Sequence, residues 1–267
     1  MAMLLIDVGN TRLKWALAAL PEVALPATGN WLQSGSAAHA DLDQLSAPWQ
    51  RLTVSRVLIS NVAGDALRAR LQALLAATFG AQLTPEWFAS LPQLAGLRNG
   101  YRAPAQLGCD RFAAALGAQQ LFPQQALIVA TCGTATTIDA VSADGWFSGG
   151  MILPGLGLMA ASLARSTAQL PHITELSTEH AAPTATFADN TDDAIISGCI
   201  NAQAGAIERA VMLHSRERSA QIRCVVAGGA AALIAPHLSI AHERVDNLVL
   251  LGLQIAAAHF GTAIGTH

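Results

Sequence analysis

The sequence predicts an α/β protein built from two similar halves. An apolar segment, Met3–Ile6, runs through an aspartate into a Gly-Asn-Thr turn and a second apolar segment, Leu13–Leu17. The same order of apolar strand, Gly-Thr turn and strand returns at residues 126–141, about half a chain later. Strands and amphipathic helices alternate after the first hairpin, which is typical of α/β domains. We therefore expect two α/β domains, residues 1–122 and 123–267, that face one cleft.

The first half has two further elements with clear boundaries. Apolar residues fill the centre of Arg56–Asn61, which predicts a short buried strand. Gly64–Phe79 carries leucines three to four residues apart, which predicts an amphipathic helix that Gly80 ends. The other expected elements are a strand at 31–34, a helix at 37–45 that stops before Pro48, a strand at 82–88, a Gly- and Pro-punctuated loop at 91–104 and a helix at 108–121.

The second half repeats this pattern. Its expected elements are strands at 126–131, 138–141 and 146–153, helices at 155–165, 190–218 and 248–260, and a strand at 224–227 that runs through Gly228 and Gly229 into a helix. The long helix starts with the capping and acidic residues Asn190–Asp193. Two explanations are open for its apolar positions, core packing or the interface of a homodimer: Ile196, Ile200, Ile207 and Val211.

The composition favours a cytoplasmic globular protein. Charged residues make up 12% of the chain and the net charge is −3, so we expect no nucleic-acid partner and no anionic membrane partner. No apolar run reaches the ~18 residues that span a bilayer, and Met1–Ile6 is too short for a signal segment. The four cysteines and eight histidines show no metal-ligand spacing, so we expect reduced thiols and no zinc site.

Groups that suit a phosphate gather around the first turn. Its backbone N–H groups, the Thr11 hydroxyl and the Lys14 ammonium could surround a polyphosphate, while Asp7 could hold Mg²⁺ through water. Gly9 and Asn10 suit the positive φ values that a tight hairpin turn demands. The alternative is an ordinary hairpin in which Asp7 accepts hydrogen bonds from the turn.

Two later turns add to this phosphate chemistry. The second hairpin presents Gly133 and Thr134, and together the two hairpins could hold both ends of a triphosphate. Gly228 and Gly229 allow the backbone to approach a flat ring or a phosphate without an intervening Cβ, although such a pair also has a purely structural use. Small-residue turns at the ends of apolar strands predict a nucleotide cleft between duplicated domains.

A candidate catalytic base opens the helix at 108–121. Asp110 lies in its first turn, where the helix dipole stabilises a carboxylate, and it could take a proton from a substrate hydroxyl. Arg111 beside it could bind the carboxylate of a small acid with two parallel hydrogen bonds. The alternative is a plain helix-terminal carboxylate next to a solvated arginine.

Seven motifs, in order along nearly the whole chain, resemble one family, the type III pantothenate kinases. They are Asp7-x-Gly9-Asn10-Thr11-x-x-Lys14, Tyr101-x-x-Pro104-x-x-Leu107-Gly108-x-Asp110-Arg111, Gly133-Thr134-Ala135-x-Thr137, Gly149-Gly150-x-Ile152-x-Pro154-Gly155, Thr167-Ala168-x-Leu170-Pro171, Asn190-Thr191 and Ala227-Gly228-Gly229. The Gly-x-Asp-Arg segment and the Pro-Gly to Leu-Pro segment are the most specific. The stretch Leu20–Ala47 carries none of the resemblance.

The resemblance implies two ribonuclease H-like domains of the acetate/sugar kinase–Hsp70–actin type, with a nucleotide cleft between them and a homodimeric assembly. The implied reaction is the phosphorylation of pantothenate by ATP with Mg²⁺, the first step of coenzyme A biosynthesis. By position, Asp110 matches the general base and Thr134 the second ATP contact. The first phosphate loop is matched by Asp7, Val8, Gly9, Asn10, Thr11, Arg12, Leu13 and Lys14. The pantothenate site, to which the partner subunit contributes, is matched by Tyr101, Gly108, Cys109, Asp110, Arg111 and Thr191.

One departure from the family concerns a monovalent cation, K⁺ or NH₄⁺. Many members carry an aspartate two residues before the Gly-Thr turn, and this chain has Thr131 there. We therefore expect weak cation binding, or a replacement ligand such as Asp139. Two other functions remain open, an ATP-binding transcription accessory protein and a sugar or small-acid kinase on the same fold. The presence of Asp110 favours catalysis.

Overall fold

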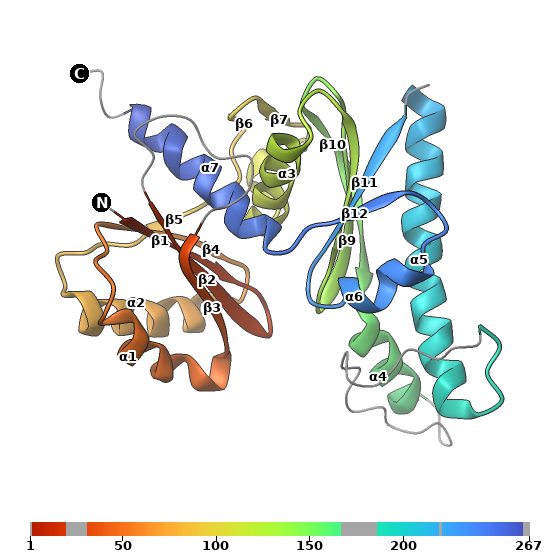
Figure 1. Ribbon diagram of the computed structural model, residues 1–267, viewed down its shortest axis with the longest axis horizontal. Coiled ribbons are helices and arrows are strands. Elements are labelled where there is room, and N and C mark those ends of the chain that lie inside the picture. The colour runs from red at the N-terminus through yellow and green to blue at the C-terminus, as the bar shows by residue number, and fades with distance from the viewer. Residues whose placement is uncertain (1, 20–30, 167–185, 219–220, 264–267) are drawn as a thin grey trace. The chain divides into compact units, whose positions relative to one another are not determined.

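The computed structural model describes residues 2–19, 31–166, 186–218 and 221–263, and the motif Thr167-Ala168-x-Leu170-Pro171 lies outside them. The chain divides into two compact units (Figure 1). Unit 1 comprises Met1–Pro123, Gly145–Phe147 and Asn247–His267, and unit 2 comprises Gln124–Asp144 and Ser148–Asp246. The first break thus falls next to the expected boundary, but the C-terminal segment belongs to unit 1 rather than to the second domain.

Unit 1 is built on a five-stranded sheet of order β3-β2-β1-β4-β5. Strands β1, β2 and β3 pair antiparallel, whereas β4 is parallel to β1 and β5 is parallel to β4. The sheet strands are β1 (Ala2–Val8), β2 (Arg12–Ala19), β3 (Trp31–Ala38), β4 (Arg56–Asn61) and β5 (Glu86–Trp87). The helices are η1 (His39–Leu45, 3-10), α1 (Ser46–Trp49), α2 (Asp65–Phe79), η2 (Pro104–Gln106, 3-10), α3 (Cys109–Leu121) and α7 (Leu248–Ala263).

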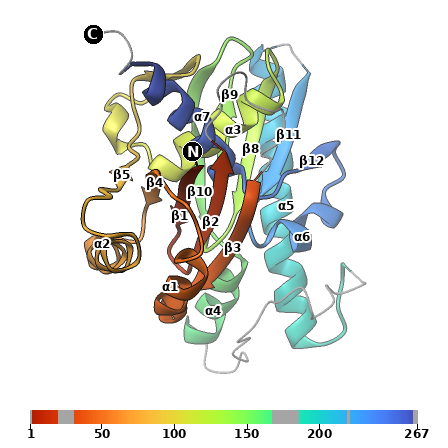
Figure 2. The same ribbon diagram turned by 60° about the vertical axis from the view of Figure 1, so that its left-hand side comes forward.

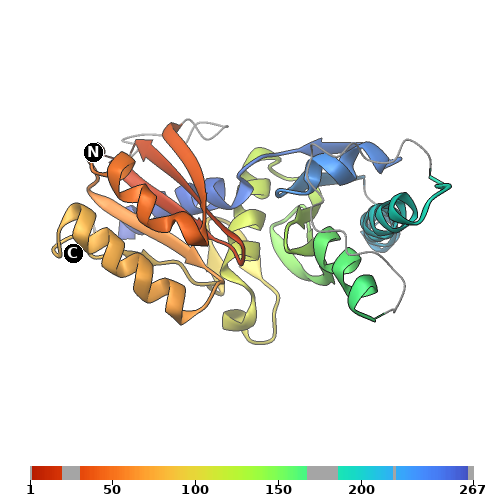
Figure 3. The same ribbon diagram turned by 90° about the horizontal axis from the view of Figure 1, so that it is seen from below.

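Both faces of this sheet are covered by helices. On one face, Leu4 and Ile6 of β1 pack with Leu71 and Leu75 of α2 and with Trp49 of α1 in one buried cluster. The helix α7 packs against β1, β2 and β4, and Figure 3 shows it on the side of the sheet opposite to α1 and α2. Successive side chains of β1 point alternately to the two faces of the sheet. Both faces are covered by helices, so all of these positions are apolar and the sequence is one continuous apolar run.

The C-terminal helix joins unit 1 because it packs directly on α3. A Cβ added at Gly252 of α7 would collide with the backbone carbonyl of Ala113 in α3, so only glycine permits this close approach of the two helices. Glycine also occurs on the α3 side, where Gly117 lies against the backbone of Leu248. The sequence showed an apolar helix at this position but not its partner. Among the helices that the structure describes, none has the length and hydropathy needed to cross a membrane.

Unit 2 repeats the topology of unit 1. Its strands lie in the order β12-β11-β8-β9-β10, in a seven-stranded sheet that continues after β10 with β7 (Leu97–Asn99) and β6 (Gln93–Leu94). Counted from β10 to β12, they are the third, second, first, fourth and fifth strands along the chain, which is the order found in unit 1. The strands β8 and β9 are antiparallel, while β11 is parallel to both β8 and β12. The elements are β8 (Ala126–Cys132), β9 (Ala135–Val141), β10 (Trp146–Pro154), α4 (Leu156–Ser166), α5 (Thr191–Arg218), β11 (Ile222–Ala227), α6 (Ala231–Ile234), η3 (Ala235–His237, 3-10) and β12 (His242–Arg244). The predicted duplication is confirmed.

The long helix α5 lies along the sheet of unit 2 (Figure 2). Ile200 and Ile207 are fully buried in a cluster with Ile128 and Val226 of the sheet, so core packing explains the apolar stripe of this helix. Asn190 caps its start, because the Asn190 side-chain oxygen accepts a hydrogen bond of 2.9 Å from the Asp193 N–H. The capping prediction is therefore confirmed.

Two predictions about local structure were wrong, and one short helix was not expected. The helix expected at 37–45 is the 3-10 helix η1, which ends before Pro48, but the unexpected helix α1 follows it and includes Pro48. A proline is tolerated in the first turn of a helix because the N–H groups there have no partner within the helix. The expected strand at 82–88 is reduced to β5. The expected loop at 91–104 contains a hairpin, β6 (Gln93–Leu94) and β7 (Leu97–Asn99), and β7 pairs with the first residues of β10. The residues between β6 and β7 have positive φ, and an alanine at the first of them gives no turn signal.

Candidate functional site

The first candidate residue, Asp7, lies near the carboxyl end of β1 and between two polar neighbours. It stands opposite Lys14 across the β1–β2 ladder and beside Ser60 in the parallel β1–β4 ladder. The turn after β1 is closed by a hydrogen bond of 3.1 Å from the Gly9 N–H to the Arg12 carbonyl. Neither Gly9 nor Asn10 has a positive φ, contrary to expectation, because three residues separate the strands and a two-residue turn is not needed.

The start of α3 is held against the end of β4. The Ser60 hydroxyl and the Cys109 thiol form a hydrogen bond of 3.3 Å, and the thiol also donates to the Asn61 carbonyl at 3.7 Å. Because β4 lies beside β1, these bonds bring Asp110 close to Asp7. Two carboxylates that are about a hundred residues apart in the sequence therefore share one site.

Burial dominates the electrostatics of this carboxylate pair. The pKa of Asp7 is raised to about 7: loss of solvent is the largest cause, the charge of Asp110 also raises the pKa, and the charge of Lys14 lowers it. Burial also raises the pKa of Asp110, and this effect outweighs the hydrogen bond of 2.8 Å from the Arg111 N–H and the Arg111 charge. The expected stabilisation of Asp110 by the start of the helix is therefore smaller than the cost of removing the carboxylate from water.

The same pair fits a hydrated Mg²⁺ ion. The raised pKa values of the two neighbouring carboxylates show that nearby positive charge does not fully compensate their negative charges, and Lys14 supplies only part of that compensation. A divalent cation prefers hard oxygen ligands and would compensate both charges. The side chain of Asp7, at the end of β1, is thus suited to the metal role that the sequence indicated.

Arg111 lies in a buried aromatic setting rather than in solvent. Its side chain is only 7% exposed, and its Nη1 donates a hydrogen bond of 2.8 Å to the Tyr101 hydroxyl. The guanidinium also lies 5.7 Å from the Tyr101 ring and 5.9 Å from the Phe147 ring. Asn99 fixes this arrangement by accepting a hydrogen bond of 3.0 Å from the Tyr101 N–H. The alternative of a solvated arginine is wrong.

We expect Arg111→Lys to raise the KM for pantothenate, the acid substrate that the resemblance implies, about tenfold and to change the KM for ATP less than about twofold. A lysine ammonium is a point charge that cannot bind a carboxylate with two parallel hydrogen bonds. Steady-state kinetics with each substrate varied in turn would measure this. The matched control is Arg68→Lys, because Arg68 lies 4.2 Å over the Trp87 ring at a position outside this cluster. Equal losses for both substrates would contradict the assignment of Arg111.

The glycine-rich turns of unit 2 also meet. The Gly155 N–H donates a hydrogen bond of 2.9 Å to the Thr134 carbonyl, and the Ala230 N–H donates one of 3.0 Å to the Cys132 carbonyl. Gly228 has φ of 96°, and an added Cβ would collide with the Cys132 carbonyl. The helix expected after Gly229 is only the single turn α6. A ligand at this turn would therefore be bound by backbone groups and not by the dipole of a long helix.

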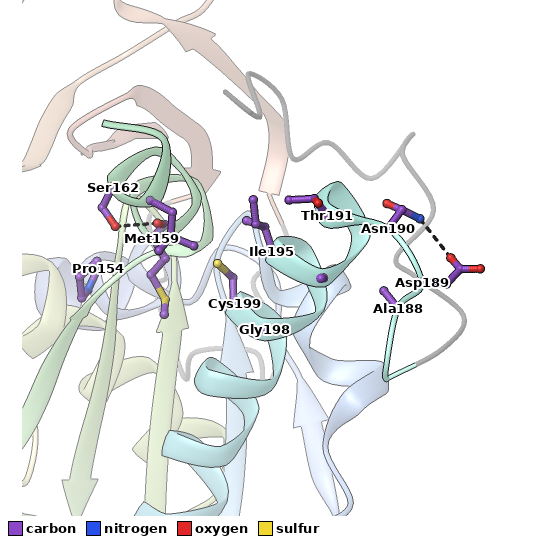
Figure 4. Close-up of a pocket in the computed structure, with 12 residues that line it drawn as sticks. Pro154, Met159, Ser162, Ala188, Asp189, Asn190, Thr191, Ile195, Gly198 and Cys199 are labelled. Atoms are coloured by element: carbon purple, nitrogen blue, oxygen red, sulfur yellow. Dashed lines mark hydrogen bonds between the residues drawn. The ribbon is translucent and has the colours of Figure 1, made fainter. Parts of the chain in front are cut away.

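The remaining candidate, Thr191, lines an apolar pocket of about 810 Å³ in unit 2. Figure 4 shows that the pocket lies between α4, with Met159 and Ser162, and the start of α5. Its volume falls within the range of small-molecule sites, which is about 300–1,000 Å³. Of the residues that the resemblance implies for pantothenate contacts, Thr191 lines this pocket, whereas Tyr101, Asp110 and Arg111 do not.

The sequence analysis did not predict three residues that support Asp7, Asp110 and Arg111 in unit 1. Ser60 links β4 to the start of α3, Phe147 lies beside Arg111, and Asn99 holds the Tyr101 backbone. Ser60 and Phe147 each lie within an ordinary strand pattern, so no local signal distinguishes them. Asn99 lies two residues before Tyr101, the first residue of one quoted motif, and this proximity was the one usable signal in the sequence.

The comparisons with known proteins concern the family and the fold of this chain. A model of the type III pantothenate kinase family matches residues 3–212. A type III pantothenate kinase from Herminiimonas arsenicoxydans is 58% identical over 259 residues, which cover 96% of this chain and 98% of the relative. A solved structure assigned to the Baf family of transcriptional activators, from Campylobacter jejuni, has a TM-score of 0.54 at 17% identity and covers 97% of this chain and 99% of its own.

A second solved structure, assigned as a 2-dehydro-3-deoxygalactonokinase from Sinorhizobium meliloti, has a TM-score of 0.53 at 16% identity and covers 99% of this chain and 100% of its own. At this identity the likeness concerns the fold, which is the expected acetate/sugar kinase–Hsp70–actin type with two α/β domains. The family match extends over most of the sequence and includes the motifs around Asp7 and Asp110. The chain therefore belongs to the type III pantothenate kinase family.

Proposed function

We propose that this protein transfers the γ-phosphoryl group of ATP to pantothenate and forms 4′-phosphopantothenate, the first step of coenzyme A biosynthesis. The observation that carries the proposal is the half-buried pair of Asp7 and Asp110 with raised pKa values, next to the buried Arg111, in a chain of the pantothenate kinase family. A protein that only bound ATP would have no use for a second carboxylate with a raised pKa at this place. The transcription accessory function is therefore the weaker candidate.

In the proposed mechanism Asp110 acts as the general base. It accepts the proton of the primary hydroxyl of pantothenate while that oxygen bonds to the γ-phosphorus and the bond to the β–γ bridging oxygen breaks, which releases ADP. A raised pKa suits this role, because a base is most effective when its pKa lies near the working pH. Mg²⁺, when bound near Asp7, would neutralise charge on the phosphate oxygens.

The other candidate residues position the two substrates. Lys14 and the turn at 9–12 would hold one end of the triphosphate, and Thr134 with the Gly228-Gly229 turn would contact ATP from unit 2. Arg111 would bind the pantothenate carboxylate. The expected nucleotide cleft between the two domains stays a prediction.

An ADP-release assay with several acceptors tests the proposed function. We expect turnover with pantothenate and none with glycerol, acetate or glucose at the same concentration. Turnover with another acceptor and none with pantothenate would refute the proposal in favour of a different kinase. ATP binding without turnover of any acceptor would favour the regulatory alternative.

We propose that the active assembly is a homodimer in which Thr191 of one subunit contributes to the partner's pantothenate site. The apolar stripe of α5 does not support this, since it packs in the core. Support comes instead from apolar side chains exposed beside the pocket: Ile152 is 66% exposed and Phe187 is 94% exposed, far more than such residues usually are. Light scattering of the active enzyme tests the assembly. A fully active monomer of 27.7 kDa would refute it.

We also propose a cytoplasmic location. All four cysteines are free, and burial raises the pKa of Cys132 and of Cys224 to about 12, so these thiols stay protonated. Free, protonated thiols suit a reducing compartment.

A monovalent cation is proposed to activate the enzyme only weakly. Thr131 replaces the aspartate that many family members carry, and its hydroxyl, like that of Thr137 opposite, has no hydrogen-bond partner among the described residues. These hydroxyls offer neutral oxygens, whereas a carboxylate would add a charge interaction of about 4 kcal/mol at 4 Å before desolvation, at an effective dielectric constant of about 20. The rival ligand is the buried Asp139, which lies two residues after Thr137 on β9.

We expect activation by K⁺ or NH₄⁺ to saturate only at high concentration, and Thr131→Asp to lower the half-saturating concentration at least tenfold. Activity would be titrated with KCl at constant ionic strength, with a bulky organic cation as the balance. Tight K⁺ dependence in the wild-type enzyme would show that Asp139 or another group has replaced the missing aspartate. Asp139→Asn would then abolish that dependence.

A further inference from the structure

The turn that begins the phosphate hairpin is held by a side chain from outside every family motif. His39, the first residue of η1, forms a hydrogen bond of 2.9 Å between its Nε2 and the Gly9 carbonyl oxygen. A carbonyl oxygen can only accept, so Nε2 must carry the proton and donate it. His39 lies in the stretch Leu20–Ala47, which shows no resemblance to the family.

His39 is itself fixed from two sides. It directly follows Ala38, which pairs with Arg12 at the start of β2, so β3 delivers it to the turn. Arg70 of α2 donates a hydrogen bond of 2.7 Å to the His39 carbonyl, and its other terminal nitrogen forms an ion pair of 2.7 Å with Asp43. The imidazole donor is therefore attached to a braced backbone rather than to a free loop.

The bond to Gly9 has a direct consequence for the next N–H group. In a trans peptide the carbonyl of one residue and the N–H of the next point in opposite directions, and the described residues, Gly9 and Asn10 among them, contain no cis peptide. The bond from His39 therefore makes the Asn10 N–H point away from the imidazole. Without the hydrogen bond from His39, the plane of the Gly9–Asn10 peptide could flip, since glycine tolerates both orientations. The Gly9 carbonyl would then point in the direction in which the Asn10 N–H had pointed.

We propose that His39 is a positioning residue for ATP, which orients the Gly9–Asn10 peptide so that the Asn10 N–H faces the triphosphate. The inference rests on the proposed function of the hairpin as a phosphate loop. A carbonyl turned toward the phosphates would repel them, whereas an N–H attracts them. His39 thus acts on nucleotide binding through the backbone and contacts no substrate itself.

Three variants of the full chain test this proposal. His39→Ala and His39→Phe remove the donor, and the phenylalanine keeps the ring volume in case the alanine variant folds poorly. His39→Gln places an amide N–H at about the same position and serves as the conservative rescue. The matched control is His242→Ala, because the His242 Nδ1 also lies 2.9 Å from a carbonyl, that of Ile240, but in unit 2 and outside the candidate site.

The measurements are the KM values for ATP and pantothenate and the dissociation constant of Mg²⁺ with the non-hydrolysable analogue AMP-PNP, by calorimetry. We expect both donor-less variants to raise the KM for ATP and the AMP-PNP dissociation constant about five- to tenfold, as one lost hydrogen bond should. The KM for pantothenate should stay within twofold, and His39→Gln should stay near the wild type.

Unchanged AMP-PNP binding in His39→Phe, equal losses for both substrates, or no rescue by glutamine would overturn the proposal. A wild-type protein that binds AMP-PNP but does not phosphorylate pantothenate would count against the proposed function alone. The ratio of AMP-PNP affinities between variant and wild type would still decide the role of His39.

Discussion

Asp110→Asn is expected to fold normally and to lose phosphoryl transfer by 10²–10⁴-fold. Removal of a general base typically costs that much, which corresponds to roughly 3–5 kcal/mol in the activation barrier. The fold should survive because an asparagine oxygen can still accept the hydrogen bond of 2.8 Å that the Arg111 N–H donates to the Asp110 side chain. Single-turnover kinetics would measure the chemical step, and circular dichroism would check the fold.

A matched control separates this effect from the loss of any helix-terminal carboxylate. Asp65 also lies in the first turn of its helix, α2, but is exposed to solvent. Asp65→Asn should therefore leave turnover unchanged. Turnover of Asp110→Asn within threefold of wild type would remove Asp110 from the role of base, and the proposed mechanism would then need another proton acceptor.

Asp7→Asn is expected to abolish productive use of Mg·ATP and, in the absence of ligands, to make the protein more stable above pH 7. The pKa of Asp7 is about 7 in the folded protein and 3.8 as the model-compound value. Between these values the folded state binds more protons than the unfolded state, so the free energy of unfolding falls as the pH rises from about 4 to 7. The difference is worth at most about 4 kcal/mol at 1.36 kcal/mol per pKa unit.

An asparagine carries no charge, so the fall in the free energy of unfolding between about pH 4 and pH 7 that Asp7 causes should be absent in the variant. Urea unfolding of the metal-free proteins at pH 5 and pH 8 would measure it: the variant should gain 1–3 kcal/mol over wild type at pH 8, in order of magnitude, and little at pH 5. Added Mg²⁺ should stabilise wild type more than the variant. A variant that is less stable than wild type at pH 8 would show that Asp7 is a structural residue rather than a strained ligand.

The carboxylate pair also explains why the two aspartates should be studied together. Each raises the electrostatic cost of ionising the other, because the charge of Asp110 is one cause of the raised pKa of Asp7. Repulsion between the two carboxylates destabilises the metal-free protein. A bound cation removes this repulsion, so the same repulsion strengthens the binding of Mg·ATP.

The sequence alone determined the duplicated α/β architecture and most element boundaries. Arg56–Asn61 was predicted as a strand and is β4, and the long helix from residue 190 is α5 with the expected Asn190 cap. These features follow from local periodicity and local hydrogen bonding, which the sequence records directly. The motifs around Asp7 and Asp110 were also visible, because each occupies one turn or one helix start.

Only the tertiary structure decided which of these pieces meet. The position of α7 in unit 1 depends on the Gly252 contact with Ala113, and the pairing of Asp7 with Asp110 depends on the bond between Ser60 and Cys109. The sign of the pKa shift at Asp110 likewise follows from burial and not from its helix position. Such contacts join residues that are far apart along the chain, and no local pattern records them. Burial, and the electrostatics it produces, exists only once the chain has folded.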